Sequence, residues 1–131
     1  GQDRFAEGYL RVLDESESEI IEWNGIPLEI AVECKSKDDL SEDVVGSDDA
    51  TDVVRKADGQ PYQVTIGNPG FDTDAIDDAK RQGILLLTAS AFATLVIYAH
   101  KESISPETYA EIFTTEGQLT RPDILEILDE W

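Results

Sequence analysis

The sequence is poor in several residue types, and each shortage excludes a class of protein. Of its 131 residues one is cysteine, one is histidine and none is methionine. A single cysteine excludes an internal disulfide and a zinc site built from cysteines. We therefore expect Cys34 to be a buried thiol in the core of a protein from a reducing cytoplasm.

Long apolar runs are also missing. No run could cross a bilayer and none near the start has the pattern of a signal peptide, so we expect a cytoplasmic protein with no membrane partner. The sequence begins at Gly1 without an initiator methionine, which suggests an excised domain or a cleaved tag.

Basic residues are scarce. The chain has ten lysines and arginines and 29 aspartates and glutamates, which gives a net charge of −19. However, 40% of the residues are hydrophobic, which is enough for a folded core. The acids are spread along the chain, a composition that resembles that of haloarchaeal proteins. In molar salt the Debye length is about 3 Å, so mutual repulsion is screened. The alternative is an acidic domain that binds a basic partner.

Apolar periodicity and turn residues predict an α/β fold. Strands are expected at 9–13, 19–23, 28–35, 62–66 and 84–87. Helices are expected at 48–57, 73–82, 88–101, 105–113 and 120–131. Asn24-Gly25 is typical of a hairpin turn, so the first three strands are expected to form a meander. This order predicts a single domain with a mixed central sheet of about five strands, helices on both faces, a core over 1–102 and a C-terminal helical extension over 103–131.

An acid and a lysine occupy one strand of this sheet. Glu33 and Lys35 are two residues apart in 28–35, so their side chains should project from the same face. Both residue types are depleted in strands. A metal-dependent hydrolytic site needs such a pair, because a carboxylate binds a hard cation and an ammonium offsets charge on a phosphate.

These residues resemble a known family. A hairpin that leads into a strand ending Glu33-Cys34-Lys35 is similar to the PD-(D/E)XK nuclease superfamily. The later stretch PYQVTIGNPGFDTDAIDDAKRQGILLLTASAFATLV resembles the second half of Mrr-type restriction endonuclease domains. The resemblance spans roughly 9–98, and it implies a restriction-endonuclease-like fold.

The resemblance also implies roles for individual residues. Glu33 would be the second acidic metal ligand, and Lys35 would position water and stabilise the transition state. The family's first acid lies on the preceding strand, opposite Glu33, but the usual Pro-Asp is missing. Glu19 and Asp14 are the two candidates; Glu19 fits the family spacing better, whereas Asp14 is the commoner acid. Glu7 is a further candidate, as some members add an acid from the first helix.

The implied function is that of a Mg²⁺-dependent endonuclease that hydrolyses DNA, with Mn²⁺ as a substitute. It would be the cleavage module of a larger restriction or DNA-repair enzyme. No basic recognition helix is visible, so an attached DNA-recognition domain or a homodimer partner would select the target. The alternative is a catalytically inactive descendant of the fold, used as a structural or protein-interaction domain at high salt.

Overall fold

A five-stranded mixed sheet forms the centre of the molecule in the computed structural model, which describes residues 6–37 and 44–129. Its strands, in spatial order, are β1 (Gly8–Arg11), β4 (Glu29–Ser36), β5 (Tyr62–Asn68), β6 (Leu85–Thr88) and β7 (Gly117–Leu119). β1 runs antiparallel to β4, and every other neighbouring pair is parallel. The predicted α/β fold with a mixed sheet of about five strands is confirmed.

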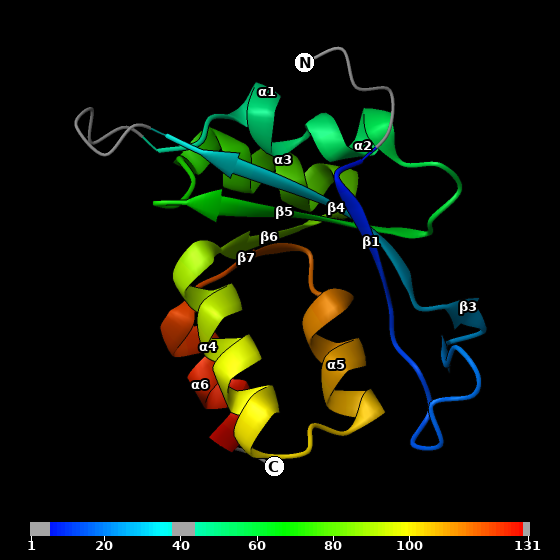
Figure 1. The fold of residues 1–131 in the computed structure, drawn as a ribbon. Coiled ribbons are helices and arrows are strands. Elements are labelled where there is room, and N and C mark those ends of the chain that lie inside the picture. The colour runs from blue at the N-terminus through cyan, green and yellow to red at the C-terminus, as the bar shows by residue number, and fades with distance from the viewer. Residues whose placement is uncertain (1–5, 38–43, 130–131) are drawn as a thin grey trace.

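Helices cover both faces of this sheet (Figure 1). One face carries α1 (Ser47–Ala50), α2 (Asp52–Lys56) and α3 (Thr73–Gln82). The other carries α4 (Ala89–Lys101), α5 (Pro106–Phe113) and α6 (Arg121–Asp129). No helix among the described residues is long and apolar enough to cross a membrane.

Two hydrophobic cores result, one on each side of the sheet. Alternate residues of β4 point to opposite cores, because side chains alternate along a strand. Ile30 and Val32 belong to the core under α4, α5 and α6. Ala31 belongs to the smaller core under α1 and α3. Glu33 follows in the same alternation and therefore faces the α1–α3 side.

The predicted helix over 73–82 is confirmed at both ends. The side chain of Asp72 accepts a hydrogen bond from the backbone N–H of Ala75, and Gly83 ends the helix in the left-handed conformation with φ of 72°. Thr88 and Ser105 cap α4 and α5 in the same way. These ends were predictable because capping depends on residues that lie within a few positions of each other.

The expected meander is wrong in its pairing. Asn24-Gly25 does form a turn, with φ of 53° and 81°, but it joins only β2 (Glu22–Trp23) and β3 (Ile26–Pro27), which form a separate two-stranded sheet. The strand beside β4 is β1, with Gly8 opposite Val32 and Arg11 opposite Glu29. Leu10 and Val12 pack against the larger core, which holds this earlier segment against β4.

Other expected elements differ from the observed ones or lie partly outside the described residues. The helix expected over 48–57 is two short helices separated at Thr51, and Gly46 is at the N-cap of the first. β7 was not predicted; it places part of the expected C-terminal extension in the central sheet itself. The last predicted helix is observed as α6, and residues 130–131 lie outside the described residues. Residues 38–43 also lie outside them; they make up most of the segment 37–47, whose many acids and few apolar side chains predict a loop.

Candidate active site

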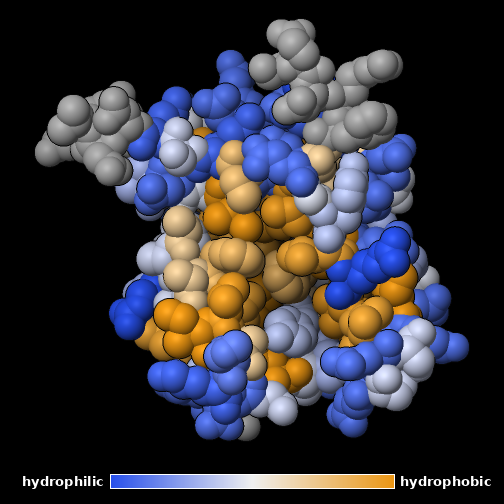
Figure 2. Space-filling model, in the orientation of Figure 1, coloured by the Kyte–Doolittle hydropathy of each residue, from blue (hydrophilic) through white to orange (hydrophobic). Residues whose placement is uncertain are grey.

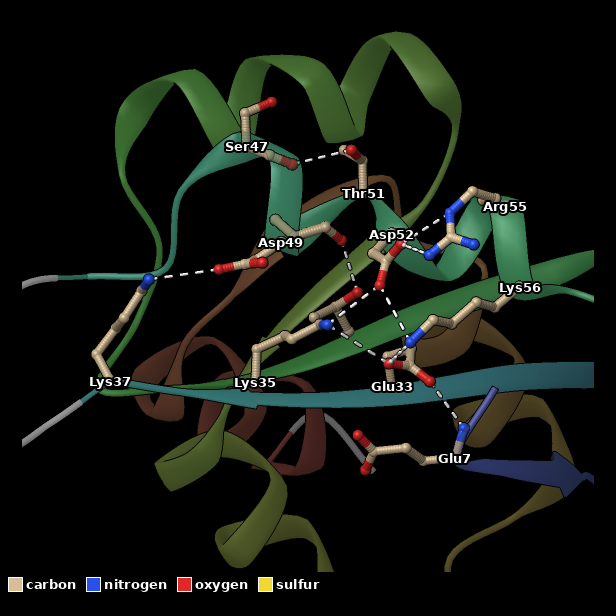
Figure 3. Close-up of polar contacts among 12 residues, drawn as sticks. Glu7, Glu33, Lys35, Lys37, Ser47, Asp49, Thr51, Asp52, Arg55 and Lys56 are labelled. Carbon is tan, nitrogen blue, oxygen red and sulfur yellow. Dashed lines mark hydrogen bonds and ion pairs between the residues drawn. The ribbon is translucent and has the colours of Figure 1, made fainter. Parts of the chain in front are cut away.

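Glu33 is a fully buried carboxylate on β4, with 0% of its surface exposed. Its Oε1 accepts a hydrogen bond of 2.8 Å from the backbone N–H of Glu7. Its Oε2 lies 3.2 Å from Nζ of Lys56 and 3.7 Å from Nζ of Lys35 (Figure 3). Both oxygens therefore have partners, as a charge inside a protein requires.

Lys35 lies on the same face of β4 as Glu33, as the two-residue spacing predicts. Its side chain is 22% exposed, and its Nζ is 3.2 Å from Oδ2 of Asp52. Lys35 thus connects the buried carboxylate to a second acid at the surface of α2.

α2 contributes three charged side chains at helical spacing. Asp52 Oδ2 lies 3.1 Å from Nζ of Lys56, one turn later, and Asp52 Oδ1 lies 2.6 Å from the guanidinium of Arg55. Lys56 is only 6% exposed and joins Asp52 to Glu33. Val53, wholly buried in the smaller core, fixes α2 against the sheet.

The electrostatics of the site follow from these contacts. Partial burial would raise the pKa of Asp52, but hydrogen bonds from Arg55, Lys56 and Lys35 outweigh it and lower the pKa to about 2. Hydrogen bonds to Asp52 and then to Glu33 raise the pKa of Lys56. Asp52 and Lys56 are thereby held in their charged forms at neutral pH.

Asp52 and Lys56 were not predicted as site residues. An acid and a lysine four residues apart are common on exposed helix faces, so their spacing alone does not mark a site. The signal that could have marked them was their position in the helix expected over 48–57, the first expected helix after the strand that carries Glu33 and Lys35. Only the packing of α2 on β4 brings the four side chains together.

Asp14 and Glu19 do not reach Glu33, so neither can act as the first acid in the arrangement we expected. They close the turn beyond β1, where the backbone N–H of Asp14 donates to the carbonyl of Glu19. β1 runs antiparallel to β4, so this turn lies beyond the Arg11–Glu29 end of the pair, away from Glu33 (Figure 1). Hydrogen bonds from Ser18 and Ser16 lower the pKa of Asp14, which has a local role in the turn.

Asp14 lines a different concavity. A groove of about 1090 Å³ lies between α4, α5 and the end of β1, on the opposite side of the sheet from Glu33. Figure 2 shows apolar side chains gathered on this side of the molecule. The lining includes Leu95, Val96 and Phe113, and its chemistry does not resemble that of the Glu33 cluster.

Glu7 immediately precedes β1 and lies beside Glu33. It contributes its backbone N–H, while its carboxylate points away from the cluster in Figure 3.

The prediction that Cys34 is a core residue is wrong: the thiol is exposed. β1 begins at Gly8, opposite Val32, so Cys34 lies beyond the paired part of this neighbouring strand. Partial burial, then the charges of Glu7 and Glu33, raise its pKa.

The carboxylates of Glu33 and Asp52 are the side chains in the cluster that could bind Mg²⁺. Among the described residues, no three carboxylate, thiol or imidazole side chains are close enough to share an ion. One oxygen of Glu33 and one of Asp52, however, lie within 3.2 Å of the same Lys56 Nζ, so two carboxylates converge on one point. Mg²⁺ is commonly held by one or two carboxylates, with waters and substrate phosphate completing its shell. Glu33 and Asp52 therefore fit this ion.

Comparison with known proteins adds no assignment. The chain matches no family model, no curated protein and no solved structure. Any function must therefore be argued from the site itself.

Proposed function

We propose that this domain is a Mg²⁺-dependent endonuclease of PD-(D/E)XK type that hydrolyses DNA phosphodiester bonds, as the cleavage module of a larger restriction or DNA-repair enzyme. The observation behind the proposal is the cluster in which Glu33 and Lys35 of β4 meet Asp52 and Lys56 of α2. It lies toward the carboxyl end of a parallel strand, where ligands of α/β sheets usually bind.

Each side chain has a role that its position supports. Glu33 and Asp52 would hold Mg²⁺, with Mn²⁺ as a substitute; the chemistry this ion supplies is activation of water and neutralisation of phosphate charge. Lys35 is the more exposed lysine, so its ammonium can approach a phosphate oxygen and stabilise negative charge in the transition state. Lys56, nearly buried, balances the charge of Glu33 when no metal ion is bound.

The charge balance of the site favours an anionic substrate. Three cations, Lys35, Arg55 and Lys56, surround only two carboxylates, although the whole chain carries a net charge of −19. Arg55 is exposed and could contact a neighbouring phosphate. Sequence selection would come from an attached recognition domain or from a second copy of the domain.

One observation favours a second candidate, a catalytically inactive domain of the same fold that serves as a structural or protein-interaction module. Both oxygens of Glu33 are paired inside the protein, and two ammonium groups lie beside it. A buried ion-pair cluster of this kind can be retained because it specifies the packing of α2 on β4.

The test of the nuclease proposal is cleavage of supercoiled plasmid in molar KCl with Mg²⁺. The wild type should nick the plasmid, and Glu33→Gln and Lys35→Ala should each lose at least about 100-fold in rate. Lys37→Ala is the matched control, because Lys37 is two residues farther along and, among the described residues, pairs with Asp49, whose side chain is 50% exposed. Absence of nicking by the wild type, or equal rates in Glu33→Gln, would refute the proposal.

Calorimetric titration with Mn²⁺ separates the two candidates. A metal-dependent site should show saturable binding that is lost in Glu33→Gln. An inactive structural cluster should show no saturable binding in either protein.

A further inference from the structure

The most unusual side chain in the cluster is Lys56. Its ammonium lies 3.2 Å from Glu33 Oε2 and 3.1 Å from Asp52 Oδ2, and only 6% of its surface is exposed. A divalent cation bound by these two carboxylates would occupy the position of the Lys56 ammonium and would take over its role in balancing their negative charge. Lys35 differs, because it is farther from Glu33, at 3.7 Å, and more exposed.

We propose that Lys56 is an internal counter-ion that competes with the divalent cation for Glu33 and Asp52, so that displacement of its side chain controls loading of the site. This inference rests on the proposed function and concerns its regulation. No other ligand is required, because the competitor belongs to the chain itself.

Electrostatics supports competition over simultaneous binding. An ammonium and a divalent cation that share a carboxylate oxygen would be a few ångströms apart, and repulsion at that distance is severe where little water screens it. Glu33 is wholly buried, so loss of a partner without replacement would leave a buried charge unpaired. Glu33 and Asp52 already share the two ammonium groups of Lys35 and Lys56, so a divalent cation that bound without release of Lys56 would place four positive charges beside two carboxylates.

The local structure allows Lys56 to leave. It is the last residue of α2, a helix of five residues, and the following Ala57 is already extended, with ψ of 142°. Val53 anchors the first part of the helix in the core. Rotation of a four-carbon side chain at the helix end would release Glu33 and Asp52 while α2 stays in place.

The competition predicts that removal of the Lys56 charge tightens binding of the divalent cation. We would titrate Mn²⁺ into the wild type and into Lys56→Met, which keeps most of the side-chain volume without the charge. The Mn²⁺ dissociation constant should fall by about tenfold or more in Lys56→Met. Lys37→Met changes the net charge equally at an exposed pair, so its dissociation constant should change by less than about twofold.

The outcomes distinguish this inference from the proposed function. Tighter Mn²⁺ binding by Lys56→Met, together with no plasmid cleavage by the wild type, would support the competition and refute the nuclease. Equal or weaker binding by Lys56→Met, while Glu33→Gln abolishes binding, would overturn the competition and leave the metal site standing. Absence of binding in the wild type and in Lys56→Met alike would also overturn it.

A measurement on the wild type covers the case in which Lys56→Met does not fold. Lysine-selective ¹H–¹⁵N spectra should show a Lys56 ammonium protected from exchange by its two acceptors. Addition of Mg²⁺ should abolish that protection and leave the Lys37 signal unchanged. A protected Lys56 ammonium at saturating Mg²⁺ would overturn the proposal.

Discussion

Asp52 provides the sharpest test of the cluster, because its contribution to stability should depend on pH in a defined way. We expect Asp52→Asn to unfold more easily than the wild type at pH 7. The substitution keeps the size of the side chain and removes its negative charge. Lys35, Arg55 and Lys56 would then lose a common acceptor.

The magnitude follows from the shift in pKa. The pKa of Asp52 is lowered from 3.8 to about 2. At 1.36 kcal/mol per pKa unit, the charged form contributes roughly 2 kcal/mol to the free energy of unfolding. The side chain is 19% exposed, so solvent reduces this value only in part. Because the folded-state pKa is the lower one, the contribution is complete above about pH 4 and is lost as the pH falls through about 2.

Urea denaturation of both proteins at constant ionic strength, between pH 7 and pH 2, measures this difference. Titration of the other carboxylates affects both proteins alike and cancels in the comparison. Asp49→Asn is the matched control, because Asp49 is an acid on α1 that pairs with the exposed Lys37. We expect it to cost less than about 1 kcal/mol, as exposed pairs do.

Two results would contradict this explanation. A difference between wild type and Asp52→Asn that stays constant down to pH 2 would mean that the charge of Asp52 does not stabilise the fold. A loss in Asp49→Asn as large as in Asp52→Asn would mean that any acid on these helices has the same effect.

Three further predictions concern other parts of the molecule. The thiol of Cys34 should react more slowly with a disulfide reagent at pH 8 than free cysteine, and faster in Glu7→Gln, because burial and nearby acids raise its pKa; equal rates in both proteins would refute the role of Glu7. Gly67→Ala should lose about 1–3 kcal/mol in urea denaturation, since its Cβ would overlap the buried ring of Phe71; unchanged stability would be inconsistent with that packing. The melting temperature should rise from about 0.1 M to about 2 M KCl as the excess negative charge is screened; a fall would exclude salt adaptation.

Local signals predicted the fold well where a few adjacent residues decide the structure. α3 was predicted residue for residue, because a capping aspartate begins it and a left-handed glycine ends it. The turn at Asn24-Gly25 was also predicted. The partner of β4 was not, because a turn signal specifies where the chain reverses and not how far the two arms remain paired.

The same distinction between local signals and long-range packing applies to the candidate site. The two-residue spacing of Glu33 and Lys35 correctly placed them on one face, since strand periodicity is local. The partners on α2 depend on how that helix packs on the sheet, which the sequence pattern does not encode. The prediction that Cys34 is buried was wrong for a related reason: alternation predicts the face of the sheet on which Cys34 lies, whereas its exposure depends on where β1 begins.

The charge distribution has a final consequence for how DNA would be engaged. Three of the ten basic residues, Lys35, Arg55 and Lys56, surround Glu33 and Asp52 on β4 and α2, in a chain that carries 29 acids. In molar salt electrostatic forces extend only about 3 Å, so neither the excess of acid nor this local excess of base acts at long range. Attraction to a phosphate would then require direct contact with the cluster, and non-specific affinity falls steeply with salt. A nuclease domain of this composition should therefore bind DNA weakly alone, and productive cleavage would depend on a partner module or second copy that holds the duplex against Lys35.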